Sequence, residues 1–161
     1  MDISKITEFL YVGAEPSATD APALARLEFR LLISMIGGWP PPKELSAPPL
    51  NLLWLASYDT FVTPIRMDKL ARGVRAARRV IESRGRVLVF CHQGRHRSVV
   101  MASAILIAGG LSAEQAMALI SSRRAIADPY AWYIRRQIVK FETSWQASGK
   151  AEQLGFEELD V

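Results

Sequence analysis

The feature that most constrains the fold is a buried strand that runs into a short loop and then into an apolar helix. Residues 86–90, RVLVF, are an almost continuous apolar run, as is typical of strands buried on both faces of a sheet. Cys91 follows at once, Gly94 lies midway in the turn, and a helix is expected over residues 97–108. Strands of this kind occur in sheets that are covered by helices, so this segment predicts an α/β fold.

The rest of the chain repeats the alternation of strands and helices. Thr63 and Pro64 indicate a helix start, and Ser112 with Gln115 forms a capping-box pattern. Five prolines between residues 39 and 49 indicate a loop. We therefore expect an α/β domain with a central mixed, largely parallel sheet flanked by helices on both faces. Strands are expected at residues 9–12, 29–35 and 51–56, and further helices at 63–83, from 112 and from 128.

Length and composition indicate one globular domain. The chain has 161 residues, is 50% apolar and 22% charged, and its single cysteine cannot form an internal disulfide. No secretory signal and no apolar stretch long enough to span a membrane is visible, so we expect a cytoplasmic monomer. The predicted organisation is one domain over residues 1–147, followed by an acidic, flexible tail over residues 148–161.

The charge is distributed unevenly along the chain. Residues 147–161 carry one lysine and four carboxylates, a net charge of −3, which leaves +7 on residues 1–146 of the total of +4. A basic body attracts anions, which are nucleic acids, anionic membranes or phosphorylated substrates. The interleaved aromatic and basic residues of a single-strand groove are missing, so no nucleic-acid partner is expected, although the 5′-triphosphate of RNA stays open as a substrate.

The loop after the buried strand is expected to form an anion-binding site. Backbone N–H groups between a strand end and a helix N-terminus can converge on one point, where the helix dipole adds positive potential. Arg97 could hold two phosphate oxygens while the sulfur of Cys91 faces phosphorus, and Ser98 could hydrogen-bond that sulfur. For an isolated cysteine the ordinary interpretation is a buried structural thiol. The glycine, arginine and serine at fixed offsets favour a nucleophile.

The segment CHQGRHRS, residues 91–98, resembles the C-x-x-G-x-x-R-S signature of the cysteine-dependent protein tyrosine phosphatase superfamily, in particular its small dual-specificity group. EFLYVGAEPSA near the start and SSRRAIAD before the last helix also resemble this family, so the similarity covers roughly residues 5–146. The family has a general-acid aspartate about thirty residues before the cysteine, and Asp59 stands 32 positions before Cys91. Asp68 is the rival carboxylate, and an ordinary loop or N-cap role is the alternative for Asp59.

The resemblance implies a phosphomonoester hydrolase that works through a phosphocysteine intermediate on phosphotyrosine, with or without phosphoserine and phosphothreonine, in proteins. No metal or cofactor is implied, and phosphate, vanadate or sulfate-like anions should inhibit. Arg124 corresponds to a family arginine that can meet a second anionic group of the substrate; an exposed helix-end arginine is the equal alternative. The implied catalytic residues are Cys91, Arg97, Asp59 and Ser98, and the phosphate-binding loop comprises His92, Gln93, Gly94, Arg95, His96 and Arg97.

Two other interpretations compete with a protein phosphatase. Arg95 and His96 resemble basic loop positions of lipid-directed relatives, so a phospholipid or phosphoinositide phosphatase is the first alternative. Phe90 stands where the family usually has histidine, so a catalytically weak phosphate-binding module is the second. His92 and His96 have the i, i+4 spacing of a metal pair, but Gly94 between them places both in a turn, where we expect them to line the pocket.

Overall fold

One mixed sheet forms the centre of the molecule. The computed structural model describes the backbone of residues 1–157 and the side chains of residues 1–149. The strands of this part are β1 (Ile3–Lys5), β2 (Leu10–Ala14), β3 (Phe29–Ile36), β4 (Asn51–Ser57) and β5 (Arg86–Cys91). Their order in the sheet is β1-β2-β5-β3-β4. Strand β1 is antiparallel to β2, and the other neighbouring pairs are parallel. The predicted mixed, largely parallel sheet is confirmed.

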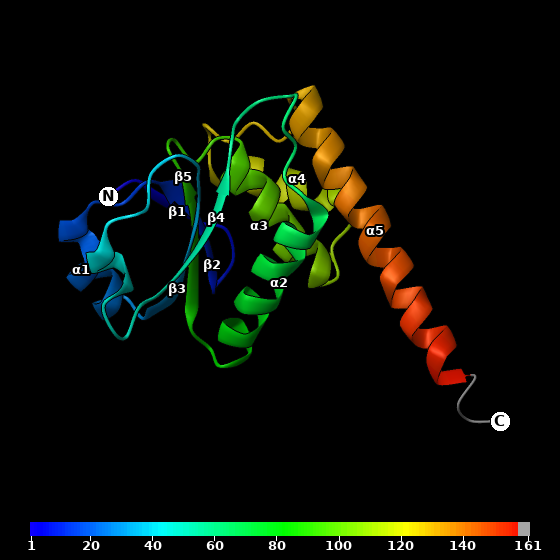
Figure 1. The fold of residues 1–161 in the computed structure, drawn as a ribbon, viewed down its shortest axis with the longest axis horizontal. Coiled ribbons are helices and arrows are strands. Elements are labelled where there is room, and N and C mark those ends of the chain that lie inside the picture. Colours follow the sequence, from blue (N-terminus) through cyan, green and yellow to red (C-terminus); the bar gives the residue numbers. More distant parts are fainter. Residues whose placement is uncertain (158–161) are drawn as a thin grey trace.

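The two faces of the sheet are covered unequally. The helices are α1 (Ala21–Arg26), α2 (Met67–Glu82), α3 (Arg97–Ala108), α4 (Ala113–Arg123) and α5 (Trp132–Glu157). Helix α1 covers one face, and α2 to α5 lie on the other (Figure 1). Helices α2 and α3 contact the strands directly, while α4 and α5 pack against α3. The chain therefore has helices on both faces, as the sequence predicts.

Strand β5 and helix α3 form the most deeply buried part of the core. Every residue of β5 after Arg86 is buried, and so is every residue of α3 before Ala108. Burial of a valine, leucine or phenylalanine side chain contributes about 1.5–3 kcal/mol, so both elements are firmly held. The loop over residues 92–96 connects the end of β5 to the start of α3, so both ends of the loop are fixed by the core.

Some element boundaries differ from the sequence predictions. Helix α2 begins at Met67 and not near Thr63, because the preceding segment has other hydrogen-bond partners. The backbone N–H of Thr63 donates to Oγ1 of Thr60 at 3.1 Å, and that of Ile65 donates to Oε1 of Gln137 at 2.8 Å. Residues 58–66 therefore remain a loop over the start of α5. The short helix α1 and the strand β1 were not individually expected.

The capping signals had different outcomes. The predicted capping box of α4 is present, with Oγ of Ser112 accepting the N–H of Gln115 and the Gln115 side chain accepting the N–H of Ser112. The last helix starts at Trp132, after a turn in which Oδ1 of Asp128 accepts the N–H of Ala131. Asp128 therefore stabilises the turn before the helix and is not the first residue of the helix.

The chain beyond the predicted domain boundary at residue 147 continues as helix. Helix α5 extends to Glu157, and its second half projects away from the rest of the molecule (Figure 1). The last part of the predicted tail, residues 158–161, lies outside the described residues, and the boundary itself stays a prediction. Within the described chain, none of the helices combines the length and apolar character needed to cross a bilayer.

Candidate active site

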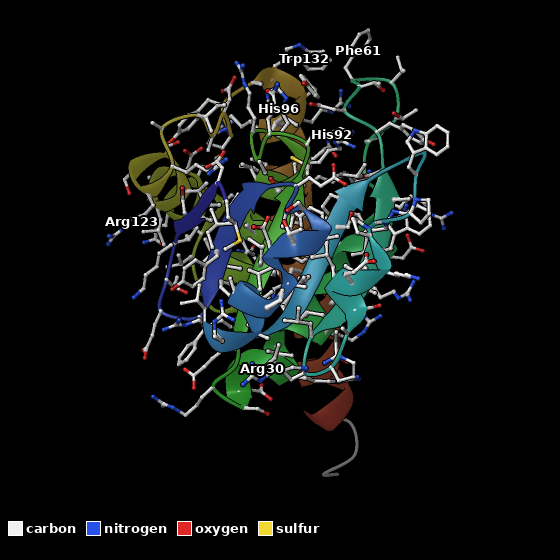
Figure 2. All side chains as sticks on the ribbon, turned by 90° about the vertical axis from the view of Figure 1, so that its left-hand side faces the viewer. Arg30, Phe61, His92, His96, Arg123 and Trp132 are labelled. Carbon is white, nitrogen blue, oxygen red and sulfur yellow. The ribbon has the colours of Figure 1, made fainter. Side chains whose placement is uncertain are left out.

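The loop between β5 and α3 borders a cavity of about 280 Å³. The cavity lies at the carboxyl edge of the parallel strands, where α/β sheets bind their ligands. His92 and His96 mark this end of the molecule, and Arg30 marks the opposite end (Figure 2). The lining residues are Asp59, Cys91, His92, Gln93, Arg95, His96 and Arg97. Five of these seven belong to the predicted phosphate-binding loop, and the other two are Cys91 and the predicted acid, Asp59.

The loop conformation depends on Gly94. Its φ is +65°, and a Cβ there would lie 2.6 Å from the carbonyl carbon and oxygen of Gly13. A side chain would therefore be strained by the backbone conformation and would also collide with the neighbouring strand. Gly94 is itself buried and does not line the cavity.

Arg124 holds the back of this loop. Its Nε donates to the carbonyl oxygen of Gly94 and its Nη2 to that of Gln93, both at 2.8 Å. The guanidinium also pairs with Asp2, with two N–H···O distances of 2.9 Å, and these hydrogen bonds lower the pKa of the Asp2 carboxyl. With these carbonyl oxygens bound on the outside, the loop N–H groups are free to face the cavity.

This position differs from both interpretations of Arg124 made from the sequence. Its side chain is only 2% exposed, so it is not an exposed helix-end arginine. It is also absent from the lining of the cavity, where a residue that meets a second anionic group of the substrate would have to lie. The three guanidinium nitrogens of Arg124 already bind Asp2, Ser4 and the loop, so in this structure Arg124 holds the loop from behind.

Cys91 ends β5 at the bottom of the cavity. Burial raises the pKa of its thiol, but hydrogen bonds from the Ser98 hydroxyl and from the backbone N–H groups of Ser98 and Arg95, together with the charge of Arg97, outweigh that effect and lower the pKa. Oγ of Ser98 lies 3.2 Å from Sγ. The loop therefore favours a thiolate, which is the nucleophilic form.

Nη1 of the Arg97 guanidinium has hydrogen-bond partners, whereas its Nε has none among the described residues. Nη1 donates to the carbonyl oxygen of Met35, the next-to-last residue of β3, at 3.1 Å and to that of Ser57, the last residue of β4, at 2.7 Å. Nε is buried and has no hydrogen-bond partner among the residues that the structure describes. A buried donor without a partner costs about 1–3 kcal/mol. An anion in the cavity that Arg97 lines would supply the missing acceptor.

Asp59 is held over the cavity by two side chains. The Tyr133 hydroxyl donates to Oδ1 at 3.0 Å, and Nδ1 of His96 lies 2.8 Å from Oδ2. Burial, followed by the hydrogen bond to Asp59, raises the pKa of Tyr133, which keeps its hydroxyl protonated as a donor. The rival Asp68 lies in the first turn of α2, exposed and paired with Arg66 at 3.0 Å, and it does not line the cavity.

His92 and His96 do not act as a pair. His92 is exposed, with its Nδ1 3.5 Å from a carboxylate oxygen of Glu15. The His96 side chain is 16% exposed and lies between two carboxylates, with Nδ1 toward Asp59 and Nε2 3.8 Å from Asp128. Both histidines line the cavity as expected, but His96 contacts the predicted acid.

Tyr133 is the functional residue that sequence reasoning missed. Its hydroxyl reaches Asp59 across a separation of 74 residues. No local pattern indicates such a contact, because the sequence gives no register between the loop after β4 and the start of α5.

Phe90 is a core residue. Its side chain is completely buried, and it precedes Cys91 in β5, so the two side chains point to opposite faces of the sheet. Its ring therefore contributes packing, and the thiol interacts with the loop, Ser98 and Arg97.

Fold and site together have the arrangement that the sequence resemblance implies: a largely parallel sheet whose central strand ends in a buried thiol, followed by a loop and a buried arginine. Among solved structures, PTPMT1 superposes with a TM-score of 0.82 at 22% identity, over 92% of this chain and 99% of that chain. Human DUSP28 gives 0.79 at 24% identity over 91% and 96%, and DUSP15 gives 0.78 at 25% identity over 91% of each chain.

The chain thus has the fold of the small dual-specificity phosphatases, and the resemblance stated from the sequence is confirmed. Neither a protein-family model nor a curated protein matches the sequence. The same fold occurs in a human tyrosine phosphatase-like serine/threonine/tyrosine-interacting protein, with a TM-score of 0.78 at 20% identity over 90% and 98% of the two chains. The structural neighbours support a phosphatase enzyme.

Proposed function

We propose that this chain hydrolyses phosphomonoesters through a phosphocysteine intermediate, as a protein-tyrosine or dual-specificity phosphatase. The observation that carries the proposal is the convergence of Cys91 and Arg97 on one cavity. The thiol has a lowered pKa, and Nε of the guanidinium has no partner within the described part of the chain. Nucleophilic attack on a phosphate dianion requires a nucleophile and a cation that binds the phosphate oxygens, and one loop provides both groups here.

In the first step the Cys91 thiolate attacks phosphorus in line with the ester oxygen. The loop N–H groups and Arg97 bind the three other phosphate oxygens, where negative charge is concentrated. Asp59 donates its proton to the departing oxygen as the P–O bond breaks and the S–P bond forms. His96 and Tyr133 keep that carboxyl group over the cavity.

In the second step the ionised Asp59 takes a proton from water, whose oxygen attacks phosphorus. The S–P bond breaks, and the hydroxyl of Ser98 stabilises the departing thiolate by hydrogen bonding. Inorganic phosphate leaves, and Asp59 is protonated again. Neither step uses a metal or a cofactor. We further propose that the enzyme is monomeric and cytoplasmic and that residues 1–147 form its catalytic domain. Phosphate, vanadate or sulfate-like anions should inhibit it competitively.

A phospholipid or phosphoinositide phosphatase is the main alternative. One structure of PTPMT1, similar to this chain with a TM-score of 0.81 at 22% identity, is a complex with PI(5)P. The basic loop residues that favour such a substrate are partly engaged here, since Arg95 lies 3.7 Å from Asp128 and His96 contacts Asp59. This pairing leaves less free positive charge for a polyanionic head group and favours the protein substrate.

The Cys91→Ser variant tests the mechanism and the binding-module alternative together. We expect the variant to lose turnover of phosphotyrosyl peptide while it still binds vanadate, because the loop and Arg97 persist. Mass spectrometry of acid-quenched wild-type protein should detect phosphate on Cys91. Wild-type protein that binds phosphate without turnover would identify a binding module, and hydrolysis restricted to phospholipid vesicles would identify a lipid phosphatase.

A further inference from the structure

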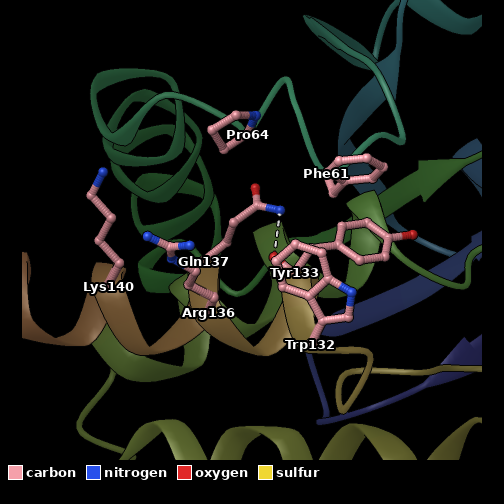
Figure 3. Close-up of a pocket in the computed structure, with 7 residues that line it drawn as sticks. All are labelled: Phe61, Pro64, Trp132, Tyr133, Arg136, Gln137 and Lys140. Atoms are coloured by element: carbon pink, nitrogen blue, oxygen red, sulfur yellow. Dashed lines mark hydrogen bonds between the residues drawn. The ribbon is translucent and has the colours of Figure 1, made fainter.

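A second cavity lies beside the catalytic one and has no part in the mechanism. This groove, of about 320 Å³, runs between the loop that carries Asp59 and the first turns of α5. Phe61 and Pro64 form its loop side, and Trp132 and Tyr133 form the helix side at one end (Figure 3). The rings of Phe61 and Trp132 are 5.9 Å apart and both are largely exposed. This end of the groove is thus an open, aromatic surface.

The other end of the groove is positively charged. Arg136 and Lys140 follow on the same face of α5, and both are exposed. Neither forms an ion pair within the described side chains, whereas the adjacent Arg135 pairs with Glu114. Two unpaired cations beside an aromatic surface are complementary to a ligand that carries an apolar group and, further along, carboxylates.

The groove adjoins the active site through Tyr133, whose side chain lines the groove while its hydroxyl donates to Asp59. Gln137 links the loop wall of the groove to the helix wall. Its Oε1 accepts the N–H of Ile65 at 2.8 Å, and its Nε2 donates to the carbonyl oxygen of Tyr133 at 2.9 Å. Since this amide is already satisfied, Gln137 supports the groove, and the cations supply its binding groups.

The dimensions fit a short extended peptide. Along a helix that rises about 1.5 Å per residue, Arg136 lies ~4.5 Å and Lys140 ~10.5 Å beyond Tyr133. An extended peptide advances about 3.3–3.6 Å per residue. A residue one to four positions from the phosphorylated one would therefore meet the groove, first at its aromatic end and then at its cations.

We propose that this groove is a substrate subsite that selects phosphopeptides with an apolar residue next to the phosphorylated side chain and acidic residues two to four positions away. The proposal rests on the proposed protein phosphatase function and specifies its substrate. A segment of this kind would place its carboxylates beside Arg136 and Lys140 while the phosphate occupies the Cys91 loop.

The test compares two pairs of phosphotyrosyl peptides, one pair with Leu-Glu-Glu-Glu after the phosphotyrosine and one with Glu-Glu-Glu-Leu before it, so that leucine is adjacent in both, each against the version with glutamine in place of glutamate. For one orientation we expect wild-type protein to have a kcat/KM about 5- to 10-fold higher for the glutamate peptide, the scale of two exposed ion pairs. The Arg136→Gln/Lys140→Gln double variant should lose this preference. Arg135→Gln changes one charge on the same helix away from the groove and should retain it.

Equal kcat/KM for glutamate and glutamine peptides in both orientations would overturn the subsite and leave the proposed function intact, because both peptides would still be hydrolysed. A preference that survives the double variant, or that Arg135→Gln also removes, would show attraction by overall charge and would equally overturn it. If wild-type protein hydrolyses only phospholipid vesicles, the protein-phosphatase function fails. Binding of the same peptides to Cys91→Ser then tests the groove separately, and equal affinities would overturn it.

Discussion

Nδ1 of His96 lies 2.8 Å from Oδ2 of Asp59. The histidine belongs to the loop after β5 and the aspartate to the loop after β4, so this contact joins the proposed phosphate-binding loop to the proposed acid. Tyr133 binds the second carboxylate oxygen from α5. Three separate segments thus determine where the proton donor sits relative to Cys91, and precise placement of a catalytic group strongly affects the rate.

Substitution of His96 should impair the acid step through the position of Asp59. We expect His96→Ala to lower kcat for phosphotyrosyl peptide about tenfold with a much smaller change in KM, since ground-state binding by Arg97 remains. His96→Gln, which keeps a polar side chain near the carboxylate, should recover part of the loss. Steady-state kinetics with leaving groups of different acidity measure this effect, and an equal loss for all leaving groups would argue against a positioning role.

Asp59→Asn tests the acid itself. We expect kcat to fall by about 10²–10⁴-fold for alkyl and tyrosyl phosphates, because the amide cannot donate the required proton. For a strongly acidic phenol the fall should be much smaller, because that leaving group departs without protonation. Asp68→Asn is the matched control and should leave turnover unchanged. A larger effect at Asp68 would reverse the assignment.

The lowered pKa of Cys91 predicts the pH dependence of its reactivity. The thiolate is the reactive form, so inactivation by iodoacetate should reach half its maximal rate at a pH below the ~8.5 of a free thiol. The kcat/KM profile should rise with pH over the same range, as the thiol ionises. Ser98→Ala removes a stabilising hydrogen bond, so both curves should move to higher pH. Phosphate should protect Cys91, and an ordinary thiol pKa in wild-type protein would count against a nucleophile.

Arg124→Met should loosen the anion loop from behind. The change leaves the carbonyl oxygens of Gln93 and Gly94 without their donors, so the free energy of unfolding should fall by about 2–4 kcal/mol. Any variant protein that folds should bind vanadate more weakly. Its exposed neighbour offers the control, because Arg123→Met should change stability by no more than about 0.5 kcal/mol. Urea unfolding measures both, and equal stabilities would refute the role of Arg124.

The catalytic loop could be predicted because its information is local. Strand β5, the turn at Gly94 and the start of α3 follow one another within a few residues, and Cys91, Arg97 and Ser98 occupy fixed offsets in that segment. Apolar periodicity also located β3, β4 and the body of α2. Pro64 suggested a helix start that is absent, because Gln137, 72 residues away, binds the backbone of Ile65 and holds it in the loop.

By itself, the sequence determined the α/β class, the sheet with its central strand, and the segment that holds the proposed nucleophile and anion clamp, because short-range geometry and the burial of apolar runs depend on neighbouring residues. Only the tertiary structure decided which distant side chains complete the site. His96 and Tyr133 reach Asp59, and Arg124 binds carbonyl oxygens of the loop from behind. Such contacts depend on how loops and helices dock on the sheet, and that docking is set by the packing of the whole core, which no local pattern records.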